Sequence, residues 1–251
     1  MVTASPAPVA LVTGAARRIG RAIAQDLAAN GWAVAIHFNR SEVEAEETAA
    51  GIRRSGGTAM IVGGDLGDRD AHATMIAEAG RGLGPVTLLV NNASMFEKDT
   101  VGRLDRALWD RQMAVNLTAP VFLAEAFAAA LPPDLEGNVV NLLDQRIWRP
   151  TPAYFSYQIS KSALAVATDT LAQALAPRVR VNGIAPGPVL PSAHGSRDAF
   201  ERQVVGLWLE RAPDLADFGR TVRYLVENRS ITGQIIALDG GQHLGPKPAI
   251  R

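Results

Sequence analysis

The sequence predicts an α/β fold with a doubly wound parallel sheet and helices on both of its faces. Two observations support this fold: short, continuously apolar runs alternate with segments of helical periodicity, and a glycine-rich turn separates the first run from the first helix. Parallel strands buried on both faces are apolar throughout, and right-handed βαβ connections place the intervening helices on the two faces of the sheet.

The first units show the pattern most clearly. The first strand, at 8–12, is an uninterrupted apolar run, and the helix at 19–29 places Ile19, Ile23 and Leu27 on one stripe. An asparagine and a glycine follow this helix and end it, because glycine accepts the left-handed conformation of a C-cap. The next units repeat this order, with strands at 32–38, 58–62 and 86–90 and helices at 42–54 and 68–79.

The second half continues the alternation. A long helix at 107–131 is ended by Pro132-Pro133, because proline cannot continue a helix. Further elements are a helix at 155–176 and strands at 139–143, 179–184 and 235–238. Residues 187–197 are irregular, and so long a segment in a compact protein usually forms a lid or binding loop, so we expect a substrate loop around 187–198. With no linker to divide it, the chain 1–251 is expected to be a single domain.

Composition excludes several classes of function. The 251 residues carry 25 basic and 25 acidic side chains, and this zero net charge argues against binding to nucleic acid or an anionic membrane surface. The absence of cysteine excludes disulfides, thiolate nucleophiles and iron–sulfur clusters, and the four histidines have no metal-ligand spacing, so no metal is expected. We find neither a secretory signal nor an apolar run long enough to span a membrane, and expect a soluble cytoplasmic protein.

The turn at 13–20, Thr-Gly-Ala-Ala-Arg-Arg-Ile-Gly, predicts a dinucleotide site. It joins the first strand to the first helix, where unpaired N–H groups and the helix dipole favour a pyrophosphate and glycine permits close approach. A tight turn without a ligand is the alternative.

The end of the second strand indicates NADP(H) rather than NAD(H). A site for NAD usually has an acidic residue there, which bonds the ribose 2′-hydroxyl, but this sequence reads His37-Phe-Asn39-Arg40-Ser41. Arg40 and Ser41 suit a 2′-phosphate, and Arg17 adds a second cation. The alternative is that both arginines are solvated surface charges.

Two later segments are expected at the same edge of the sheet, because ligands bind at the carboxyl ends of strands in such folds. Asp65 follows the third strand and can bond an adenine amino group, although Asp65-Leu66-Gly67 also reads as a simple turn. Asn91-Asn92-Ala93-Ser94 follows the fourth strand.

Tyr157 and Lys161 form a candidate acid/base pair near the start of a helix. Their spacing of four residues places phenol and ammonium on one face, about 6 Å apart along the axis. A neighbouring ammonium is expected to lower the pKa of the tyrosine, which then serves as a proton donor and acceptor near neutrality.

Together these segments resemble the short-chain dehydrogenase/reductase family over nearly the whole chain. The resemblance also includes Asn116, Pro186-Gly187 and Asp239-Gly-Gly. It implies a Rossmann-type sheet, hydride transfer to or from a nicotinamide, and homotetramers or homodimers. It further implies that Tyr157 is the acid/base, that Lys161 holds the nicotinamide ribose, and that Asn116 positions a water in a proton relay.

Two departures from the family pattern are informative. Arg18 stands where the family has glycine, and Asp144 stands 13 residues before the tyrosine, where the family has serine. A carboxylate beside the phenol raises its pKa, so Asp144 must share a proton with Tyr157 or act on the substrate.

Both departures resemble the pteridine reductase branch of the family, as do the run at 37–41, the run at 91–96 and the tail at 238–244. That branch implies a pterin ring held between the nicotinamide and an aromatic side chain, here Phe96, with Arg18 near the cofactor phosphates and the pterin. A loop-anchoring role for Phe96 is the alternative. Tyr154 is interpreted as a packing residue.

The leading hypothesis is therefore an NADPH-dependent reductase that takes a dihydropterin to its tetrahydro form. A generic ketone or sugar reductase and an NADP(H)-binding regulatory protein without turnover are the alternatives. The expected catalytic residues are Tyr157, Lys161, Asp144 and Asn116, and the expected substrate-binding residues are Arg18, Ser94, Phe96, Asp144 and Tyr157. The expected cofactor-binding residues are Gly14, Arg17, Arg18, Ile19, Gly20, His37, Asn39, Arg40, Ser41, Asp65, Leu66, Asn92, Ala93, Ser94, Tyr157, Lys161, Pro186 and Gly187.

Overall fold

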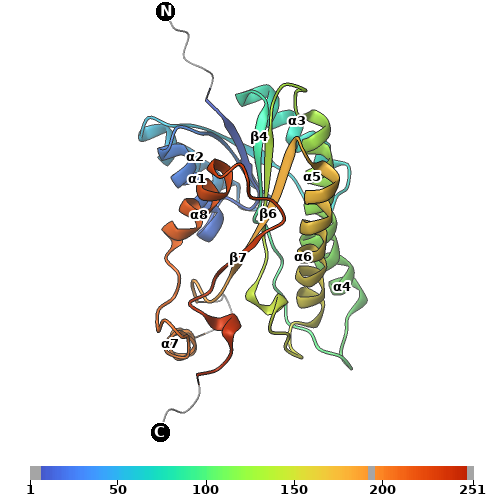
Figure 1. Ribbon diagram of the computed structural model, residues 1–251, viewed down its shortest axis with the longest axis vertical. Helices are drawn as coiled ribbons and strands as arrows, with labels where there is room; N and C mark the ends of the chain where they lie inside the picture. The colour runs from blue at the N-terminus through green and yellow to red at the C-terminus, as the bar shows by residue number, and fades with distance from the viewer. Residues whose placement is uncertain (1–6, 192–195, 248–251) are drawn as a thin grey trace, which may run out of the picture.

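A computed structural model describes residues 7–191 and 196–247 of the chain. Its centre is a seven-stranded, fully parallel sheet with the strand order β3-β2-β1-β4-β5-β6-β7 (Figure 1). The strands are β1 (Val9–Val12), β2 (Ala33–Phe38), β3 (Thr58–Gly63), β4 (Val86–Asn91), β5 (Gly137–Leu142), β6 (Val179–Pro186) and β7 (Ile235–Leu238). This is the predicted Rossmann-type α/β fold.

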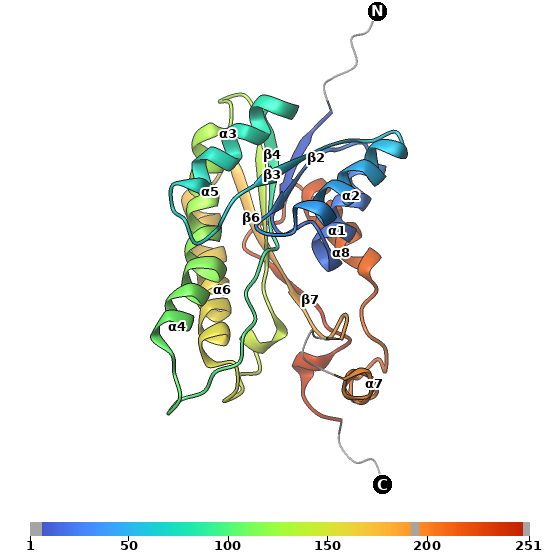
Figure 2. The ribbon, with the colours of Figure 1, turned by 180° about the vertical axis from the view of Figure 1, so that it is seen from behind.

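Helices cover both faces of the sheet. One layer contains α1 (Arg18–Ala29), α2 (Glu42–Arg54) and α8 (Leu215–Glu227), and the other contains α3 (Ala71–Leu83), α4 (Arg106–Met113), α5 (Ala119–Ala130) and α6 (Phe155–Leu175) (Figures 1 and 2). The last helix, α7 (Arg197–Val205), lies at the carboxyl end of the sheet, away from both layers (Figure 2). Short 3-10 turns follow β5 (η2, Gln145–Ile147) and β7 (η3, Gln242–Leu244).

The core is divided by the sheet into two apolar layers, as the continuously apolar strands predict. In β1, Val12 packs toward α1 and α8, whereas Leu11 packs toward α3 and α5. Ile23 and Phe218 are fully buried in the first layer, and Phe127 is fully buried in the second. Burying a side chain of this size contributes about 1.5–3 kcal/mol, so both helix layers are held mainly by their apolar faces.

The expected long helix is present, with an irregularity in its middle. Residues Ala114–Thr118 form a π-helical turn (η1) between α4 and α5, so the run Arg106–Ala130 is continuous but locally widened. Within the described residues this run is long and apolar enough to cross a membrane by length and composition, contrary to the expectation of no such segment. Leu123 and Phe127 are fully buried against the sheet, which identifies it as a core helix.

Two helices were not predicted from the sequence. Helix α8 packs against α1, where Arg223 forms an ion pair with Asp26 at 2.7 Å. Helix α7 follows the expected substrate loop, of which residues 192–195 lie outside the described part of the chain. The order of strands reverses between β1 and β4, and such a switch point is where ligands bind in open α/β sheets.

Candidate active site

A cleft of about 780 Å³ lies at the carboxyl edge of the sheet, beside this switch point. Its walls come from the turn after β1 and from the segments that follow β2, β3 and β4. The lining includes expected cofactor residues from all four segments, namely Gly14, Arg17, Arg18, Ile19, Gly20, His37, Asn39, Arg40, Ser41, Asp65, Leu66, Asn92, Ala93 and Ser94, together with Phe96. The residues that sequence reasoning missed are Ala16, Phe38, Met95, Glu97, Arg111 and Val115. Tyr157, Lys161, Pro186 and Gly187 are not among its lining residues.

The turn after β1 is built for close approach and for negative charge. Gly14 has φ +62°, and a Cβ there would lie 2.9 Å from the Cα of Ala93, so the turn is pressed against the segment after β4. Helix α1 then begins without a side-chain cap at Arg17 and without an acidic residue in its first turn. Its first N–H groups and its positive dipole are therefore available to an anion such as a pyrophosphate.

His37 supports this turn through hydrogen bonds to the backbone. Its Nδ1 accepts a hydrogen bond from the Gly14 N–H at 3.1 Å, which requires the ring proton to be on Nε2, and Nε2 donates to the Gly64 carbonyl at 3.0 Å. Burial lowers the pKa of His37 to about 4, so the ring is neutral at neutral pH. Both ring nitrogens are used by the backbone, and His37 therefore shapes the cleft wall rather than offering a hydrogen bond to a ligand.

The basic side chains of the cleft differ in their surroundings. Arg17 pairs with Glu44 at 3.3 Å, whereas Arg40 is exposed and has no ion-pair partner among residues 7–191 and 196–247. Asp65 holds Arg111 of α4 at 2.6 Å and also accepts from the Gly67 N–H at 2.8 Å, as in the simple turn. Burial is the largest single influence on the pKa of Asp65 and raises it, but the hydrogen bonds from Arg111 and Gly67 together with the charges of Arg111 and Arg40 outweigh it, so the pKa lies below its usual value.

Arg18 reaches from the turn across to the opposite loop. Its guanidinium donates to the carbonyl of Pro191 at 3.2 Å and approaches that of Leu190 at 3.5 Å. Its φ of +55° lies in the left-handed region, which glycine adopts without strain, in agreement with the glycine that the family resemblance implies at this position. Holding arginine in this conformation costs about 1–2 kcal/mol, so its side chain has a use that offsets the strain.

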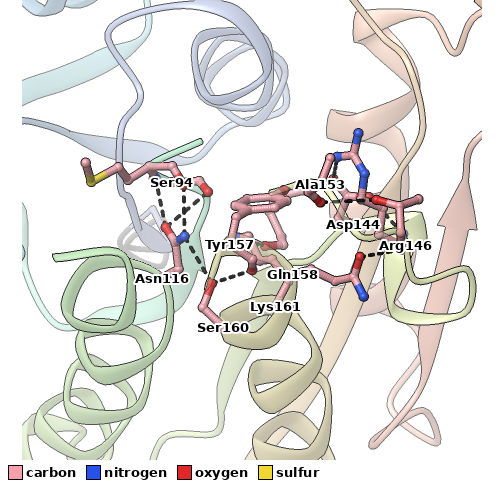
Figure 3. A network of polar contacts seen from close by, with 12 residues as sticks. Ser94, Asn116, Asp144, Arg146, Ala153, Tyr157, Gln158, Ser160 and Lys161 are labelled. Atoms are coloured by element: carbon pink, nitrogen blue, oxygen red, sulfur yellow. Dashed lines mark hydrogen bonds and ion pairs between the residues drawn. The ribbon is translucent and has the colours of Figure 1, made fainter. Parts of the chain in front are cut away.

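Tyr157, Asp144 and Arg146 form the central polar group (Figure 3). The Tyr157 hydroxyl donates to Oδ2 of Asp144 at 2.8 Å. Arg146 holds the same carboxylate twice, through its backbone N–H to Oδ1 at 2.8 Å and through its guanidinium to Oδ2 at 3.3 Å. Asp144 caps η2 in this way, and its side chain is 16% exposed.

Burial and the neighbouring Asp144 together keep the tyrosine protonated. Burial raises the pKa of Tyr157 well above 10, and the negative charge and hydrogen bond of Asp144 raise it further, while the charge of Arg146 acts in the opposite direction. The expectation of a lowered tyrosine pKa is therefore wrong, because the net shift is upward. Lys161 Nζ lies 6.0 Å from the centre of the Tyr157 ring and donates to the Leu142 carbonyl at 2.7 Å. Burial lowers the pKa of Lys161 to about 8.

The side chain of Asn116 holds the loop after β4. Its side-chain amide donates to the Met95 carbonyl at 2.9 Å and to Ser160 at 3.1 Å, and its Oδ1 accepts from the Met95 N–H and from the Ser94 hydroxyl. Both donors and both acceptor positions of the amide are occupied by protein groups. The side-chain amide is therefore fully used by protein groups (Figure 3), and the expected role of Asn116 in positioning a water stays a prediction.

An aromatic cluster adjoins the Asp144–Tyr157 pair. Phe96 stacks on Tyr154 with ring centres 4.3 Å apart, which confirms that Tyr154 is a packing residue. Tyr157 meets Phe96 nearly at a right angle at 4.7 Å, and the guanidinium of Arg146 lies 5.2 Å from the centre of the Phe96 ring. Since Tyr154 covers one face of Phe96, at most one face is available to a flat ligand.

The helix that carries Tyr157 is capped by a distant residue. Tyr154, at its N-cap, has φ +58° and forms no side-chain cap. The buried carboxylate of Asp99 instead accepts from the Ser156 N–H, with both oxygens within 3.2 Å. This contact fixes the loop after β4 to the start of α6.

Comparison with known proteins agrees with this geometry. A family model described as short chain dehydrogenase matches residues 8–202. A short-chain type dehydrogenase/reductase from Picea abies is 30% identical over 93% of this chain and 92% of its own length. A 3-oxoacyl-[acyl-carrier-protein] reductase from Synechocystis is also 30% identical, over 96% of this chain and 98% of its own.

Two solved structures are more similar. They are FolM alternative dihydrofolate reductase 1 from Brucella canis, complexed with NADP, and the same enzyme from Brucella suis, also with NADP. The first is 57% and the second 59% identical to this chain, each with a TM-score of 0.93 and 97% of both chains covered.

The chain belongs to the short-chain dehydrogenase/reductase family. Within that family, the similarity to the two Brucella structures supports the expected pteridine-reductase-like branch.

Proposed function

We propose that this protein is an NADPH-dependent reductase that takes a dihydropterin to its tetrahydro form. The family and the solved relatives support the general part of this statement, that the chain is an NADP(H)-dependent oxidoreductase of the short-chain dehydrogenase/reductase family. The substrate class is our proposal, and it rests on the residues of the site.

The observation that carries the substrate class is the hydrogen bond between Tyr157 and Asp144, at the position where the family has serine. A ketone has one oxygen that needs a proton, and a single hydroxyl beside the tyrosine suffices for it. The edge of a pterin carries an amino group and ring N–H groups, which are hydrogen-bond donors that a carboxylate accepts and a ketone lacks. Leaving such groups buried without a partner costs about 1–3 kcal/mol each.

The residues of the cleft fit the cofactor. The uncapped start of α1 and the close turn at Gly14 suit the pyrophosphate, and Arg40 with Ser41 suits the 2′-phosphate. Lys161 and the Pro186–Gly187 segment are assigned to the nicotinamide half. Bound NADPH supplies the hydride for a C=N bond of the substrate ring.

The protein supplies the proton and the orientation. The raised pKa keeps Tyr157 protonated at neutral pH, so it enters the reaction as a donor. A ring nitrogen placed beside the hydroxyl takes its proton as the adjacent carbon gains hydride. A tyrosinate beside Asp144 is unfavourable, so it takes a proton back from solvent, and the positive charge of Arg146 makes the transient anion less costly. We assign Phe96 to stack on a flat substrate through the face that Tyr154 does not cover, and Arg18 links the cleft wall to the loop at 190–191.

The remaining assignments are part of this proposal. We assign one domain to residues 1–251, with the loop around 187–198 as the far wall of the substrate pocket, a cytoplasmic location and a homodimer or homotetramer. Asn116 is assigned a positioning role, because its amide is fully used in holding Met95.

The direct test is oxidation of NADPH by the purified protein with dihydropterins and, separately, with 3-oxoacyl thioesters and simple ketones. The proposal expects kcat/KM to be greatest for a dihydropterin, with the amount of tetrahydropterin formed equal to the NADPH consumed. Efficient reduction of the 3-oxoacyl thioester without turnover of any dihydropterin would establish the reductase activity suggested by the Synechocystis relative instead.

A further inference from the structure

His243 is oriented by a buried carboxylate that follows the last strand. The Asp239 side chain is only 2% exposed, and its Oδ2 accepts hydrogen bonds from the His243 N–H at 2.7 Å and from Nδ1 of the ring at 2.8 Å. Its Oδ1 accepts from the Gly241 N–H at 2.9 Å. Because the carboxylate accepts, the ring proton is on Nδ1, and in the neutral imidazole Nε2 carries a free lone pair.

Asp239 places this unit beside the nicotinamide end of the site. The Gly187 N–H donates to the carbonyl of Leu238 at 2.9 Å, and a Cβ on Gly187 would lie 2.7 Å from the Cα of Asp239. The tail after β7 is therefore in direct contact with the Pro186–Gly187 segment. Both segments follow neighbouring strands, β6 and β7, at the carboxyl end of the sheet (Figure 1).

The contact with Trp148 places the imidazole beside the turn η2, which begins at Asp144. The rings of His243 and Trp148 have centres 5.2 Å apart, and Trp148 closes the turn η2 that begins at Asp144. The turns η2 and η3 contact each other. His243 thus lies between the segment assigned to the nicotinamide and the turn that carries the carboxylate bonded to Tyr157.

The imidazole has the properties of a ligand-binding group rather than of a packing residue. Its side chain is 32% exposed, and within the described residues Nε2 forms no hydrogen bond. The half-exposed ring of Trp148 lies beside it, and Trp208 packs against Gly241, two residues earlier in the chain, and donates from Nε1 to the Gly245 carbonyl at 2.8 Å. A fixed acceptor beside an apolar ring suits a substituent that carries hydroxyl groups on a carbon chain.

We propose that His243, oriented by Asp239, binds the hydroxylated side chain of a dihydropterin through Nε2, while the ring of the substrate lies at Asp144 and Tyr157. This inference rests on the proposed function and specifies its substrate class. A hydroxyl donates to the free lone pair of Nε2, whereas a carboxylate tail has no proton to donate and is repelled by the buried charge of Asp239.

The test combines matched variants with matched substrates. In His243→Asn, the amide nitrogen occupies the place of Nδ1 and keeps the bond to Asp239, but no atom remains at the place of Nε2. In His243→Gln, the amide reaches the place of Nε2 and the bond to Asp239 is lost. The substrates are a dihydropterin with a trihydroxypropyl side chain, one with only a methyl group, and dihydrofolate, which has an aromatic and carboxylate tail.

We expect His243→Asn to lower kcat/KM for the trihydroxypropyl substrate roughly 3- to 10-fold, mainly through KM, which is the effect of one hydrogen bond. Its kcat/KM for the methyl substrate and its affinity for NADPH stay at the wild-type values. His243→Gln is expected to keep part of the preference for hydroxyl groups, and it replaces the first variant if the first does not fold.

Other results overturn the inference. An equal loss on the methyl and trihydroxypropyl substrates means that His243 acts only through the structure, and an unchanged preference means that Nε2 does not contact the side chain. A loss confined to dihydrofolate assigns His243 to an anionic tail instead. A wild-type protein that reduces none of the three substrates overturns the proposed function together with this inference, whereas one that reduces them without dependence on His243 overturns this inference alone.

Discussion

The hydroxyl of Tyr157 donates a hydrogen bond of 2.8 Å to Asp144, the residue that stands where the family pattern has serine. The pair couples the proton donor of the proposed reaction to a carboxylate that Arg146 holds from two sides. Protonation of the tyrosine and orientation of the carboxylate thus depend on each other, and most of the following predictions concern this unit.

Tyr157→Phe is expected to lower turnover by about 10²- to 10⁴-fold, the usual contribution of a positioned proton donor. The phenyl ring keeps its contact with Phe96, so NADPH affinity is expected to stay near the wild-type value. Steady-state rates and a fluorescence titration with NADPH measure the two quantities. Turnover close to that of the wild type would show that another group gives the proton.

Arg146→Met is expected to lower kcat several-fold at neutral pH, because a weaker acid gives up its proton more slowly. The positive charge of Arg146 lowers the pKa of Tyr157, so its removal raises that pKa and moves the basic limb of the pH–rate profile to higher pH. Arg146→Lys retains the charge and is the matched control, for which the limb stays nearer to its wild-type position. A limb that moves to lower pH, or an identical profile in both variants, contradicts this role.

His37 is expected to make the fold sensitive to acid. Its pKa is about 4 in the folded protein and 6.5 when unperturbed, so between these values the unfolded state binds more protons. The free energy of unfolding therefore falls as pH drops from 6.5 to 4, by at most about 3 kcal/mol from this residue. Urea unfolding of the wild type and of His37→Asn, which does not titrate, measures the difference. Parallel pH dependence in the two proteins would contradict the assignment.

Arg40→Ala is expected to weaken NADPH binding about 10- to 100-fold and to leave NADH binding unchanged, because one charge-assisted bond to the 2′-phosphate is lost. Arg17→Ala is expected to have a smaller effect, since Glu44 already neutralises Arg17. Titration of both cofactors against each variant gives the comparison. Equal weakening of NADPH and NADH would place Arg40 outside the 2′-phosphate site.

The strands and most of the sheet-covering helices could be predicted because their signals are local. Continuous apolar runs predicted all the strands β1 to β7, and the observed ends differ from the predicted ends by at most two residues. Helix α8 was not predicted, although the sequence contains two signals for it. These are a capping box formed by Asp214 and Asp217 and an apolar stripe through Phe218 and Val222. Helix α7 has no buried residue, so no apolar stripe marks it. The π-turn at Asn116 leaves no comparable sequence signal.

Site residues could be predicted where they belong to one short sequence motif. They could not be predicted where the contact joins residues from different parts of the chain. The turn at 13–20 and the Tyr157–Lys161 spacing placed their residues at the carboxyl edge of the sheet. Arg111 was missed because its partner Asp65 is 46 residues away. Arg146 lies only two residues from Asp144, but nothing in the sequence shows that it also lies beside Phe96.

Asp144→Ser gives the most direct test of the central claim, that the Asp144–Tyr157 pair makes this site selective for a pterin. The measurement is kcat/KM for a dihydropterin and for a 3-oxoacyl thioester, in the wild type and in the variant, with NADPH affinity as the control. The account predicts that the wild type prefers the dihydropterin and that the variant loses roughly 10- to 100-fold on it, as expected when polar groups of the substrate lose a buried partner, with no loss on the thioester. A wild type that prefers the thioester, or a variant that keeps full activity on the dihydropterin, would contradict it.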